Sequence, residues 1–204
     1  GTLMLEVHSS QIPLDDLTAF AARHNPKRGF LFASKVLGKH ISARPRAIRD
    51  IHTRLAAQIP ELPGPILFIG MAETAIALGN GVFDQYVRRT GRRDVVFLHS
   101  TRYLLDQMIA FRFEEEHSHA ADHFIYMPQN LALQALLKSA RSIVLVDDEA
   151  STGKTFYNLL KAITDVMPGI KQAATVVITD WRGLHKTGIK PDYMPITTQP
   201  VAIL

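Results

Sequence analysis

Residues 142–155, SIVLVDDEASTGKT, constrain the fold of this chain more than any other stretch. The run from Ile143 to Val146 is continuous, aliphatic and largely β-branched, which is typical of a fully buried strand in a parallel sheet. Two acids, then small and hydroxylated residues, and then an amphipathic segment follow this run. We therefore predict a strand, a tight loop and a helix in succession, as part of an α/β fold built on a parallel sheet.

The loop after this strand has the composition of an anion-binding turn. A tight loop between a strand and a helix N-terminus collects backbone N–H groups around an anion. Gly153 lets the backbone approach a ligand closely, and several of its neighbours carry hydroxyl groups. We predict that the loop binds the 5′-phosphate of a sugar phosphate through the following residues: Glu149, Ala150, Ser151, Thr152, Gly153, Lys154 and Thr155.

Two carboxylates stand beside this predicted phosphate site. A site for phosphate alone would exclude them because like charges repel, so we expect these acids to face hydroxyl groups or a cation. We predict that Asp147 and Asp148 bind the ribose 2′- and 3′-hydroxyls and hold Mg2+ through water, since this ion keeps several waters and needs few carboxylates. The competing interpretation is a triphosphate-binding P-loop, because residues 153–155 read GKT. Asp148, however, stands where that motif requires a glycine.

The run from Val144 to Thr155 resembles the phosphoribosyl-pyrophosphate signature of type I phosphoribosyltransferases: an apolar run, two acids, three variable residues and Thr-Gly-x-Thr. Five further segments are similar to the orotate-phosphoribosyltransferase-like branch found in bacterial tellurium-resistance gene clusters. They read FLFASKVLGKH, FIGMAETA, LHSTRY, EEHSHAADH and TDWRG. The resemblance extends from about Phe30 to Gly183.

This resemblance implies an enzyme that binds phosphoribosyl pyrophosphate and Mg2+ and transfers phosphoribose to a nitrogen base. An orotate-like pyrimidine is the first expectation for the base. A purine base, or the reverse pyrophosphorolysis of a nucleotide, is the alternative among enzymes. A regulatory protein that binds a sugar phosphate or nucleotide without transfer is the alternative outside them.

The same resemblance divides the chain. We expect an N-terminal hood segment with helices in residues 1–60, and a phosphoribosyltransferase core in residues 61–183 whose parallel sheet has helices on both faces. Residues 184–204 are expected to form a C-terminal extension of a truncated chain and, with the N-terminal segment, a small hood over the base. Within the hood segment, the pattern predicts helices over 13–25 and 42–58 and a short strand over 29–35.

Three residues are implied to contact the base from the hood: Lys35, Trp181 and Arg182. For Trp181, packing in the interior is the alternative.

A second strand, Pro65 to Ile69, leads into a small-residue loop at the start of a helix, which is another anion site of the same kind. By resemblance this loop holds pyrophosphate, often with a cis non-proline peptide, through Gly70, Met71, Ala72, Glu73 and Thr74. Three roles stay open for Glu73: a bridge through Mg2+, a contact to a sugar hydroxyl, or capping of the helix at its positive end. Arg102 follows the next strand, over 94–101, and is implied to contact the pyrophosphate or the 5′-phosphate.

Residues 104–122 form a connection that is too long and irregular to be only structural, and we predict a lid. In type I enzymes this lid often carries a lysine, and none occurs here. We propose Arg112 and a histidine, His117, for charge neutralisation or proton transfer. A metal site at the clustered histidines His117, His119 and His123 is an alternative, although their spacing matches no closed zinc site. A further strand is predicted over 123–127.

Composition excludes some classes of protein. No apolar run is long enough to span a membrane, and no signal segment opens the chain. The chain has no cysteine and hence no disulfide framework, which fits the cytoplasm. The net charge of +4 suits an anionic substrate. Basic and aromatic residues do not interleave as in single-strand binders, so we expect no nucleic-acid partner. We expect a homodimer.

Overall fold

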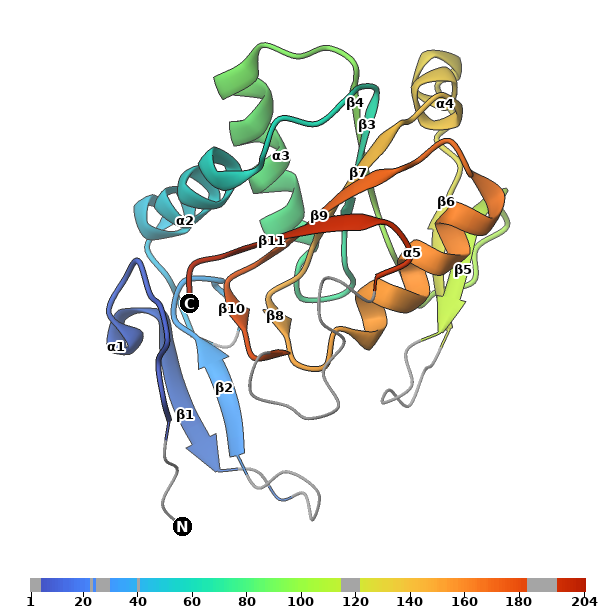
Figure 1. The fold of residues 1–204 in the computed structure, drawn as a ribbon. Helices are drawn as coiled ribbons and strands as arrows, with labels where there is room; N and C mark the ends of the chain where they lie inside the picture. Colours follow the sequence, from blue (N-terminus) through green and yellow to red (C-terminus); the bar gives the residue numbers. More distant parts are fainter. Residues whose placement is uncertain (1–4, 23, 25–29, 40, 115–121, 183–193) are drawn as a thin grey trace.

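The computed structural model describes residues 5–22, 24, 30–39, 41–114, 122–182 and 194–204. Its centre is a five-stranded parallel sheet with the strand order β11-β9-β7-β3-β4 (Figure 1). The strands of this sheet are β3 (Ile66–Gly70), β4 (Val95–His99), β7 (Ser142–Val146), β9 (Gln172–Val177) and β11 (Thr197–Ala202). The prediction of an α/β fold on a parallel sheet is confirmed.

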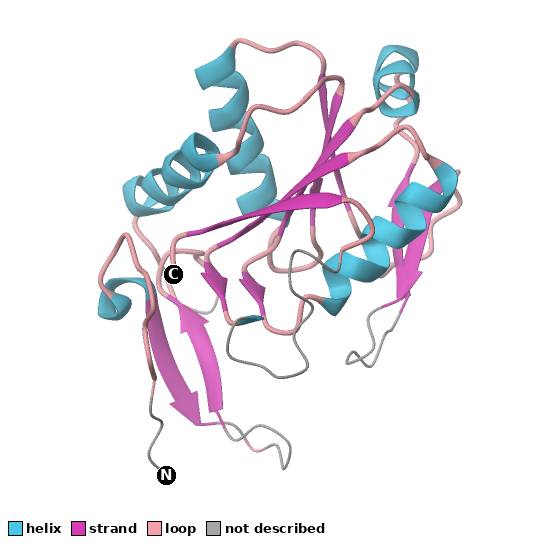
Figure 2. Ribbon diagram, in the orientation of Figure 1, coloured by secondary structure: helices cyan, strands magenta, loops and turns pink. Residues whose placement is uncertain are grey.

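Helices cover both faces of this sheet. Figure 1 and Figure 2 show α2 (Pro45–Gln58) and α3 (Ile76–Thr90) on one face and α5 (Lys154–Val166) on the other. Every residue of β3 and of β7 is buried, because both strands lie in the middle of the sheet between these layers. The apolar positions of α5 recur at helical spacing and are all buried: Phe156, Leu159, Leu160 and Ile163. The shorter α4 (Leu131–Lys138) precedes β7 and is capped by Asn130, whose side chain accepts hydrogen bonds from the Ala132 and Leu133 amides.

The register of the sheet aligns the carboxyl ends of three strands. Gly70 at the end of β3 is paired with His99 of β4 and with Val146 of β7, and Val146 is paired with Val176 of β9. The loops that follow β3, β4 and β7 therefore leave the sheet at one edge. Ligands of open parallel sheets bind at this carboxyl edge.

The N-terminal segment differs from its prediction. Of the helix predicted over 13–25, the described residues 13–22 contain only one turn, α1 (Leu14–Leu17). The chain continues as β1 (Thr18–Ala22), which pairs antiparallel with β2 (Phe30–Ser34). The rings of Phe20 and Phe32 meet edge-to-face at 5.2 Å across this hairpin. Such cross-strand aromatic contacts stabilise a sheet and outweigh the weak local preference for a helix.

The predicted lid is also more regular than expected. Residues of this stretch form β5 (Ile109–Glu114), which pairs antiparallel with β6 (Asp122–Tyr126) outside the central sheet. Phe111 and Phe113 are buried while Arg112 and Glu114 are exposed, which is the period-two alternation of a half-buried strand. The predicted strand over 123–127 therefore exists, as β6, but belongs to this hairpin and not to the parallel sheet.

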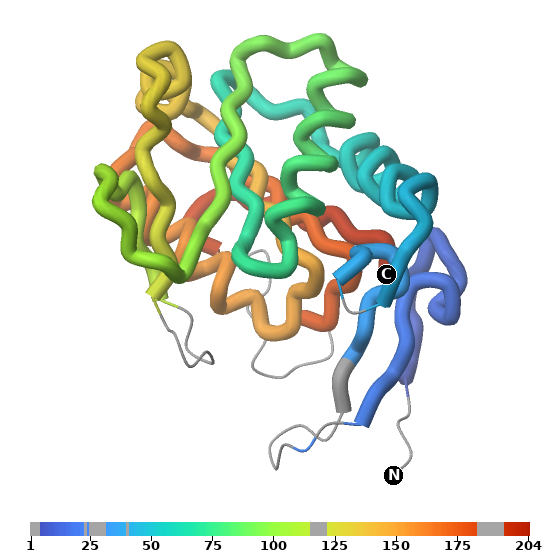
Figure 3. Tube along the Cα trace, turned by 180° about the vertical axis from the view of Figure 1, so that it is seen from behind, coloured from blue at the N-terminus to red at the C-terminus, as the bar shows by residue number. Residues whose placement is uncertain are grey.

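The two hairpins flank the carboxyl edge of the sheet from opposite sides (Figure 1 and Figure 3). A pair of two-residue parallel strands, β8 (Glu149–Ala150) and β10 (Thr179–Asp180), extends the structure beyond that edge. β11, which lies in the predicted C-terminal extension, is one of the two edge strands of the central sheet. No helix in the described ranges is both long and apolar enough to cross a membrane.

Candidate active site

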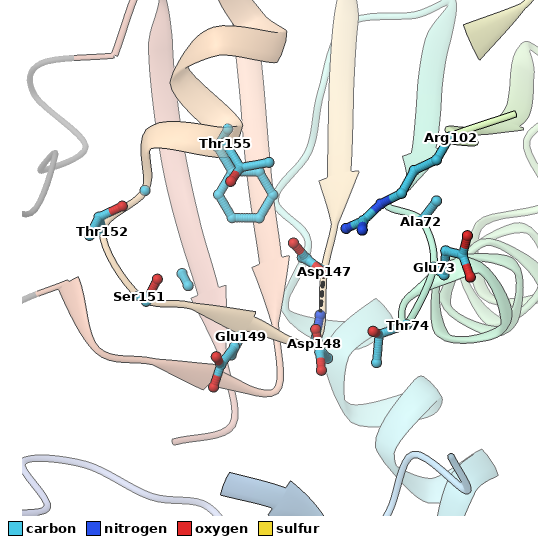
Figure 4. Close-up of a pocket in the computed structure, with 13 residues that line it drawn as sticks. Ala72, Glu73, Thr74, Arg102, Asp147, Asp148, Glu149, Ser151, Thr152 and Thr155 are labelled. Carbon is cyan, nitrogen blue, oxygen red and sulfur yellow. Dashed lines mark hydrogen bonds between the residues drawn. The ribbon is translucent and has the colours of Figure 1, made fainter. Parts of the chain in front are cut away.

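A cleft of about 180 Å3 opens at the carboxyl edge of the sheet, where the loops after β3, β4 and β7 meet (Figure 4). We call it the cleft throughout. It is lined by Ala72, Glu73, Thr74, Arg102, Asp147, Asp148, Glu149, Ala150, Ser151, Thr152, Gly153, Thr155 and Phe156. The structure thus brings together most of the residues that the sequence assigned to the sugar, the 5′-phosphate and the pyrophosphate.

The two acids after β7 are held by the end of the sheet. The Asp147 amide donates to the Val176 carbonyl at 2.9 Å, and the Asp148 amide donates to Oδ1 of Asp147 at 2.9 Å. Figure 4 shows the Arg102 guanidinium pointing toward Asp147 from the opposite wall of the cleft. Both carboxylates are half-buried and remain accessible from the cleft.

The turn between β8 and α5 has the form of an anion site. Gly153 is the N-cap of α5 with φ 78° and ψ −1°, a left-handed conformation that favours glycine. The first amides of a helix have no partner within that helix and carry the positive end of its dipole. Figure 4 places the hydroxyl-bearing residues Ser151, Thr152 and Thr155 around this turn. Lys154 begins α5 and is not among the residues that line the cleft.

The loop after β3 forms the opposite wall. Its amide at Ala72 donates to the hydroxyl oxygen of Ser100 at 2.8 Å, and the peptide bond between Ala72 and Glu73 is cis. Ala72, Glu73 and Thr74 line the cleft, whereas Gly70 and Met71 lie outside its lining. Helix α3 starts at Ile76 without a side-chain cap, so Glu73 does not cap it.

Two residues of this region, Ser100 and His123, are not among the site residues predicted from the sequence. Ser100 is fully buried, and besides the Ala72 amide its Oγ lies 3.4 Å from Nδ1 of His123, which is 1% exposed. Ser100 follows β4 and His123 lies on β6, so the two contacts of this hydroxyl join the loop after β3 to the β5–β6 hairpin. The position of Ser100 two residues before Arg102 is the one signal in the sequence that points to it.

Other predicted residues lie away from the cleft. Arg112 is exposed on β5 and forms two hydrogen bonds with the Asp122 carboxylate, at 2.8 and 3.1 Å. Lys35 donates to the backbone carbonyl of Asp15 within the hood segment. His117, together with the other histidine of the 115–121 segment, lies outside the described residues.

The two residues after β10 are packed into the protein. Arg182 is 3% exposed and binds Asp180 through Nε and Nη2, with the shortest contact at 2.6 Å. Trp181 stacks on Phe32 of the hood hairpin, with ring centroids 4.5 Å apart and an angle of 18° between the planes. The structure places Trp181 in the packing of the hood against the core, and Arg182 in a buried ion pair.

A second, smaller cavity lies between the hood hairpin and the cleft. This hood cavity measures about 20 Å3 and is lined by Leu17, Thr18, Phe32, Ser34, Asp148, Glu149, Ile178 and Thr179. It shares Asp148 and Glu149 with the cleft. These two acids therefore stand on the boundary between the predicted sugar site and the hood.

The acids of the cleft do not form a metal site made of protein ligands alone. Within the described ranges, no group of three or more His, Asp or Glu side chains is placed to hold a metal ion. Four of the residues that line the cleft are acidic and one, Arg102, is basic. A polyanion can bind beside so many carboxylates only if backbone amides and a cation offset the repulsion.

Comparison with known proteins supports this description. A family model described as phosphoribosyl transferase matches residues 17–196. Adenine phosphoribosyltransferases of solved structure have a similar fold. The protein from Thermoanaerobacter pseudethanolicus is 15% identical, with a TM-score of 0.59 over 93% of this chain and 96% of its own.

Some of the similar structures contain ligands. The adenine phosphoribosyltransferase from Trypanosoma brucei, in complex with AMP, pyrophosphate and ribose-5-phosphate, is 14% identical with a TM-score of 0.56, over 95% of this chain and 81% of its own. The protein from Saccharomyces cerevisiae, with adenine and an imino-altritol bisphosphate, is 12% identical with a TM-score of 0.55, over 92% and 95%. At such identities the likeness shows the fold alone. No curated protein sequence matches this chain.

Proposed function

This chain belongs to the phosphoribosyl transferase family, whose model matches residues 17–196, and from this premise we propose that it transfers phosphoribose to a purine base of the adenine type. It is an enzyme of the phosphoribosyltransferase type. The observation that carries the proposal is the cleft, around which the acid pair, the glycine turn before α5 and the loop after β3 come together. The adenine phosphoribosyltransferases with the same fold favour a purine over the orotate that we first expected.

The residues of the cleft have distinct roles in this proposal. Asp147 and Asp148 bind the ribose 2′- and 3′-hydroxyls, and the turn from Ser151 to Thr155 binds the 5′-phosphate. Arg102 and the loop from Ala72 to Thr74 bind the pyrophosphate. Transfer breaks the bond from ribose C1 to the pyrophosphate oxygen and forms a bond from C1 to a ring nitrogen of the base. Pyrophosphate leaves, and the proton of that ring nitrogen is released to solvent. The protein accelerates it by holding both reactants in line and by stabilising the departing charge through Arg102.

Mg2+ fits the charges of the cleft. Asp147 and Asp148 would hold the ion, because Mg2+ takes one or two carboxylates and completes its shell with water and substrate phosphates. When bound, it would offset the charge of the pyrophosphate group. We therefore expect phosphoribosyl pyrophosphate to bind much more weakly after EDTA treatment, as measured by calorimetry with and without added Mg2+.

The direct test is release of pyrophosphate from phosphoribosyl pyrophosphate, in the presence of Mg2+ and of adenine, hypoxanthine or orotate in turn. The expected result is release with adenine, and formation of AMP. If the protein binds phosphoribosyl pyrophosphate but releases no pyrophosphate with any base, it is the regulatory binding protein of our alternative reading. The reverse reaction, from AMP and pyrophosphate, is measured in the same assay.

Substitution of both acids tests the site itself. The pair Asp147→Asn and Asp148→Asn should lower the affinity for phosphoribosyl pyrophosphate by about a hundredfold or more, since two charge-assisted hydrogen bonds are lost. The thermal midpoint should stay close to that of the wild type, because both side chains are only half-buried. Asp106→Asn, an exposed acid outside the cleft, is the control. Unchanged affinity in the double variant would disprove the assignment.

Three narrower expectations stay predictions. They are membership of the tellurium-resistance branch, a cytoplasmic location and a homodimer. Light scattering on the purified protein tests the last of these.

A further inference from the structure

Among the described residues that line the cleft, Arg102 is the one that is basic. It lies on the connection between β4 and the β5–β6 hairpin, outside the helices and strands of the structure. In Figure 4 its guanidinium points into the cleft, toward Asp147. A long side chain on a connection is directed reliably at a ligand only if the backbone beneath it is held in place. The contacts that fix this backbone therefore contribute to the geometry of the site.

The residue before Arg102 is held by β6. The Thr101 amide donates to the Phe124 carbonyl and the Phe124 amide donates to the Thr101 carbonyl, both at 2.8 Å. The two residues thus form an antiparallel pair outside the named strands. Exchange of both backbone hydrogen bonds between two residues fixes the spacing of their chains. The connection therefore enters Arg102 from a point that is fastened to the hairpin.

The residues after Arg102 are held by the side chain of Tyr126, which also lies on β6. Its hydroxyl donates to the Tyr103 carbonyl at 2.9 Å and accepts from the Leu105 amide at 2.7 Å. A phenolic O–H group can donate and accept at the same time. Tyr126 is half-buried, and its ring stacks near that of Phe124, with centroids 6.4 Å apart. One strand thus holds the chain on both sides of Arg102.

We propose that Tyr126 is a positioning residue for Arg102: its hydroxyl fixes the backbone that directs the guanidinium into the cleft, and so strengthens the binding of the pyrophosphate group. This inference rests on the proposed function, in which Arg102 binds pyrophosphate. Tyr126 itself is not among the described residues that line the cleft. A side chain that is ordered before its ligand arrives loses less conformational freedom on binding, and this preorganisation raises affinity.

The test measures the affinities for phosphoribosyl pyrophosphate and for ribose 5-phosphate by calorimetry, with Mg2+, in the wild type and in Tyr126→Phe. This substitution keeps the ring and removes only the hydroxyl. The affinity for phosphoribosyl pyrophosphate should fall by about three- to tenfold, because two hydrogen bonds that order the connection are lost. The affinity for ribose 5-phosphate, which has no pyrophosphate group, should stay the same. A purely structural role would lower the thermal midpoint and leave the ratio of the two affinities unchanged.

The matched control is Tyr103→Phe. It removes a hydroxyl from the same connection, on a side chain that is 67% exposed, and keeps the carbonyl that Tyr126 contacts. It should change neither affinity.

A double variant tests whether Tyr126 acts through Arg102. Arg102→Ala should itself weaken phosphoribosyl pyrophosphate. In that background Tyr126→Phe should cause no further loss, because the effects of residues that act through one another do not add.

Three outcomes would overturn the inference. The first is an unchanged affinity for phosphoribosyl pyrophosphate in Tyr126→Phe, and the second is an equal loss of both affinities, which would indicate a general distortion of the cleft. The third is an additive loss in the double variant, which would show that Tyr126 acts independently of Arg102. Failure of the proposed function is a separate result: the wild type then releases no pyrophosphate with any base, while its affinity for phosphoribosyl pyrophosphate still depends on Tyr126 and Arg102.

Discussion

The smallest scale at which the site can be tested is the single hydroxyl of Ser100. This group accepts a hydrogen bond from the Ala72 amide at 2.8 Å in a fully buried position. Ser100→Ala leaves that amide without its acceptor, which costs about 1–3 kcal/mol for a buried group. Because Ala72 opens the loop that we assign to pyrophosphate, we expect KM for phosphoribosyl pyrophosphate to rise several-fold, with a smaller change in kcat.

The measurements are steady-state kinetics and thermal denaturation of the variant. Ser139→Ala, which removes an exposed hydroxyl at the end of α4, is the control and should change neither. A lower thermal midpoint with an unchanged KM would make Ser100 a structural residue without influence on the loop.

Single residues also show how far the sequence could predict this site. Asp147 and Asp148 were predicted because one continuous strand and turn carries them, so their local pattern contains the geometry. Ser100 was missed because its contact with His123 joins residues 23 positions apart through tertiary packing. Arg182 was assigned to the base, but a carboxylate two residues away, on Asp180, binds it in the interior. The sequence does not show that Asp180 pairs with Arg182, so the burial of this arginine in an ion pair could not be predicted.

At the scale of secondary-structure elements, Arg112 of the β5–β6 hairpin could act on the substrate or only hold the two strands together. If Arg112 neutralises charge or transfers a proton, as we propose from the sequence, then Arg112→Ala should slow turnover more than it weakens substrate binding. The structure shows Arg112 bound across the hairpin to Asp122, at 2.8 Å, in an exposed pair. Such pairs contribute about 1 kcal/mol or less to stability. Asp122→Ala is therefore a matched variant that breaks the same pair but keeps the arginine.

If Arg112 acts on the substrate, Arg112→Ala lowers kcat by about tenfold or more, as removal of a charge-stabilising group does, while Asp122→Ala has little effect. Single-turnover kinetics of both variants give the answer. Equal effects of the two substitutions would show that Arg112 only fastens the hairpin.

Helix α3 packs against β3 where Gly79 meets Gly70, and a substitution can test how closely the two elements pack. A Cβ atom on Gly79 would lie 2.7 Å from the Cα of Gly70, which is backbone and cannot move aside. Gly79→Ala should lower the free energy of unfolding, because an overpacking cost of about 1–3 kcal/mol exceeds a gain in helix propensity of up to about 1 kcal/mol. Gly169→Ala, where the nearest atom is 3.9 Å away, should be tolerated in the same urea titration. Equal stability of the two variants would show that α3 can shift on the sheet.

The elements also show why part of the fold was predictable. The strands at 66–70 and 142–146 are buried on both sides, so an unbroken apolar run identified each of them. The stretch 18–22, TAFAA, is rich in alanine, which favours a helix, and its pairing with β2 decides its conformation. Pairing between distant segments is absent from a local pattern, which is why a helix was predicted there.

Across the whole molecule, the net charge and the charge of the site have opposite signs. The chain carries +4, whereas four acids and one arginine line the cleft. The basic surface can attract a polyanion from a distance, and this attraction weakens with salt. Binding inside the cleft then depends on amides, Arg102 and a cation. We therefore expect the association rate for phosphoribosyl pyrophosphate to fall with ionic strength in stopped-flow measurements, and a rate independent of salt would contradict steering.

Global stability should depend on pH through His52, which lies on α2 and faces α3. A Cβ atom on Gly81 would lie 2.0 Å from Nδ1 of this histidine, so its ring packs directly on the α3 backbone. Burial lowers the pKa of His52, and the nearby Asp84 carboxylate opposes that shift to a smaller extent. Above neutral pH the imidazole is uncharged in both the folded and the unfolded chain and contributes nothing. Below about pH 6.5 the unfolded chain takes up a proton that the folded protein resists, so stability falls as the pH drops toward the lowered pKa.

Thermal denaturation between pH 8 and pH 5 tests this expectation. His52→Gln should lose less stability on acidification than the wild type, while His8→Gln, at an exposed position, should behave like the wild type. Parallel curves for the wild type and His52→Gln would show that protonation of His52 does not oppose folding.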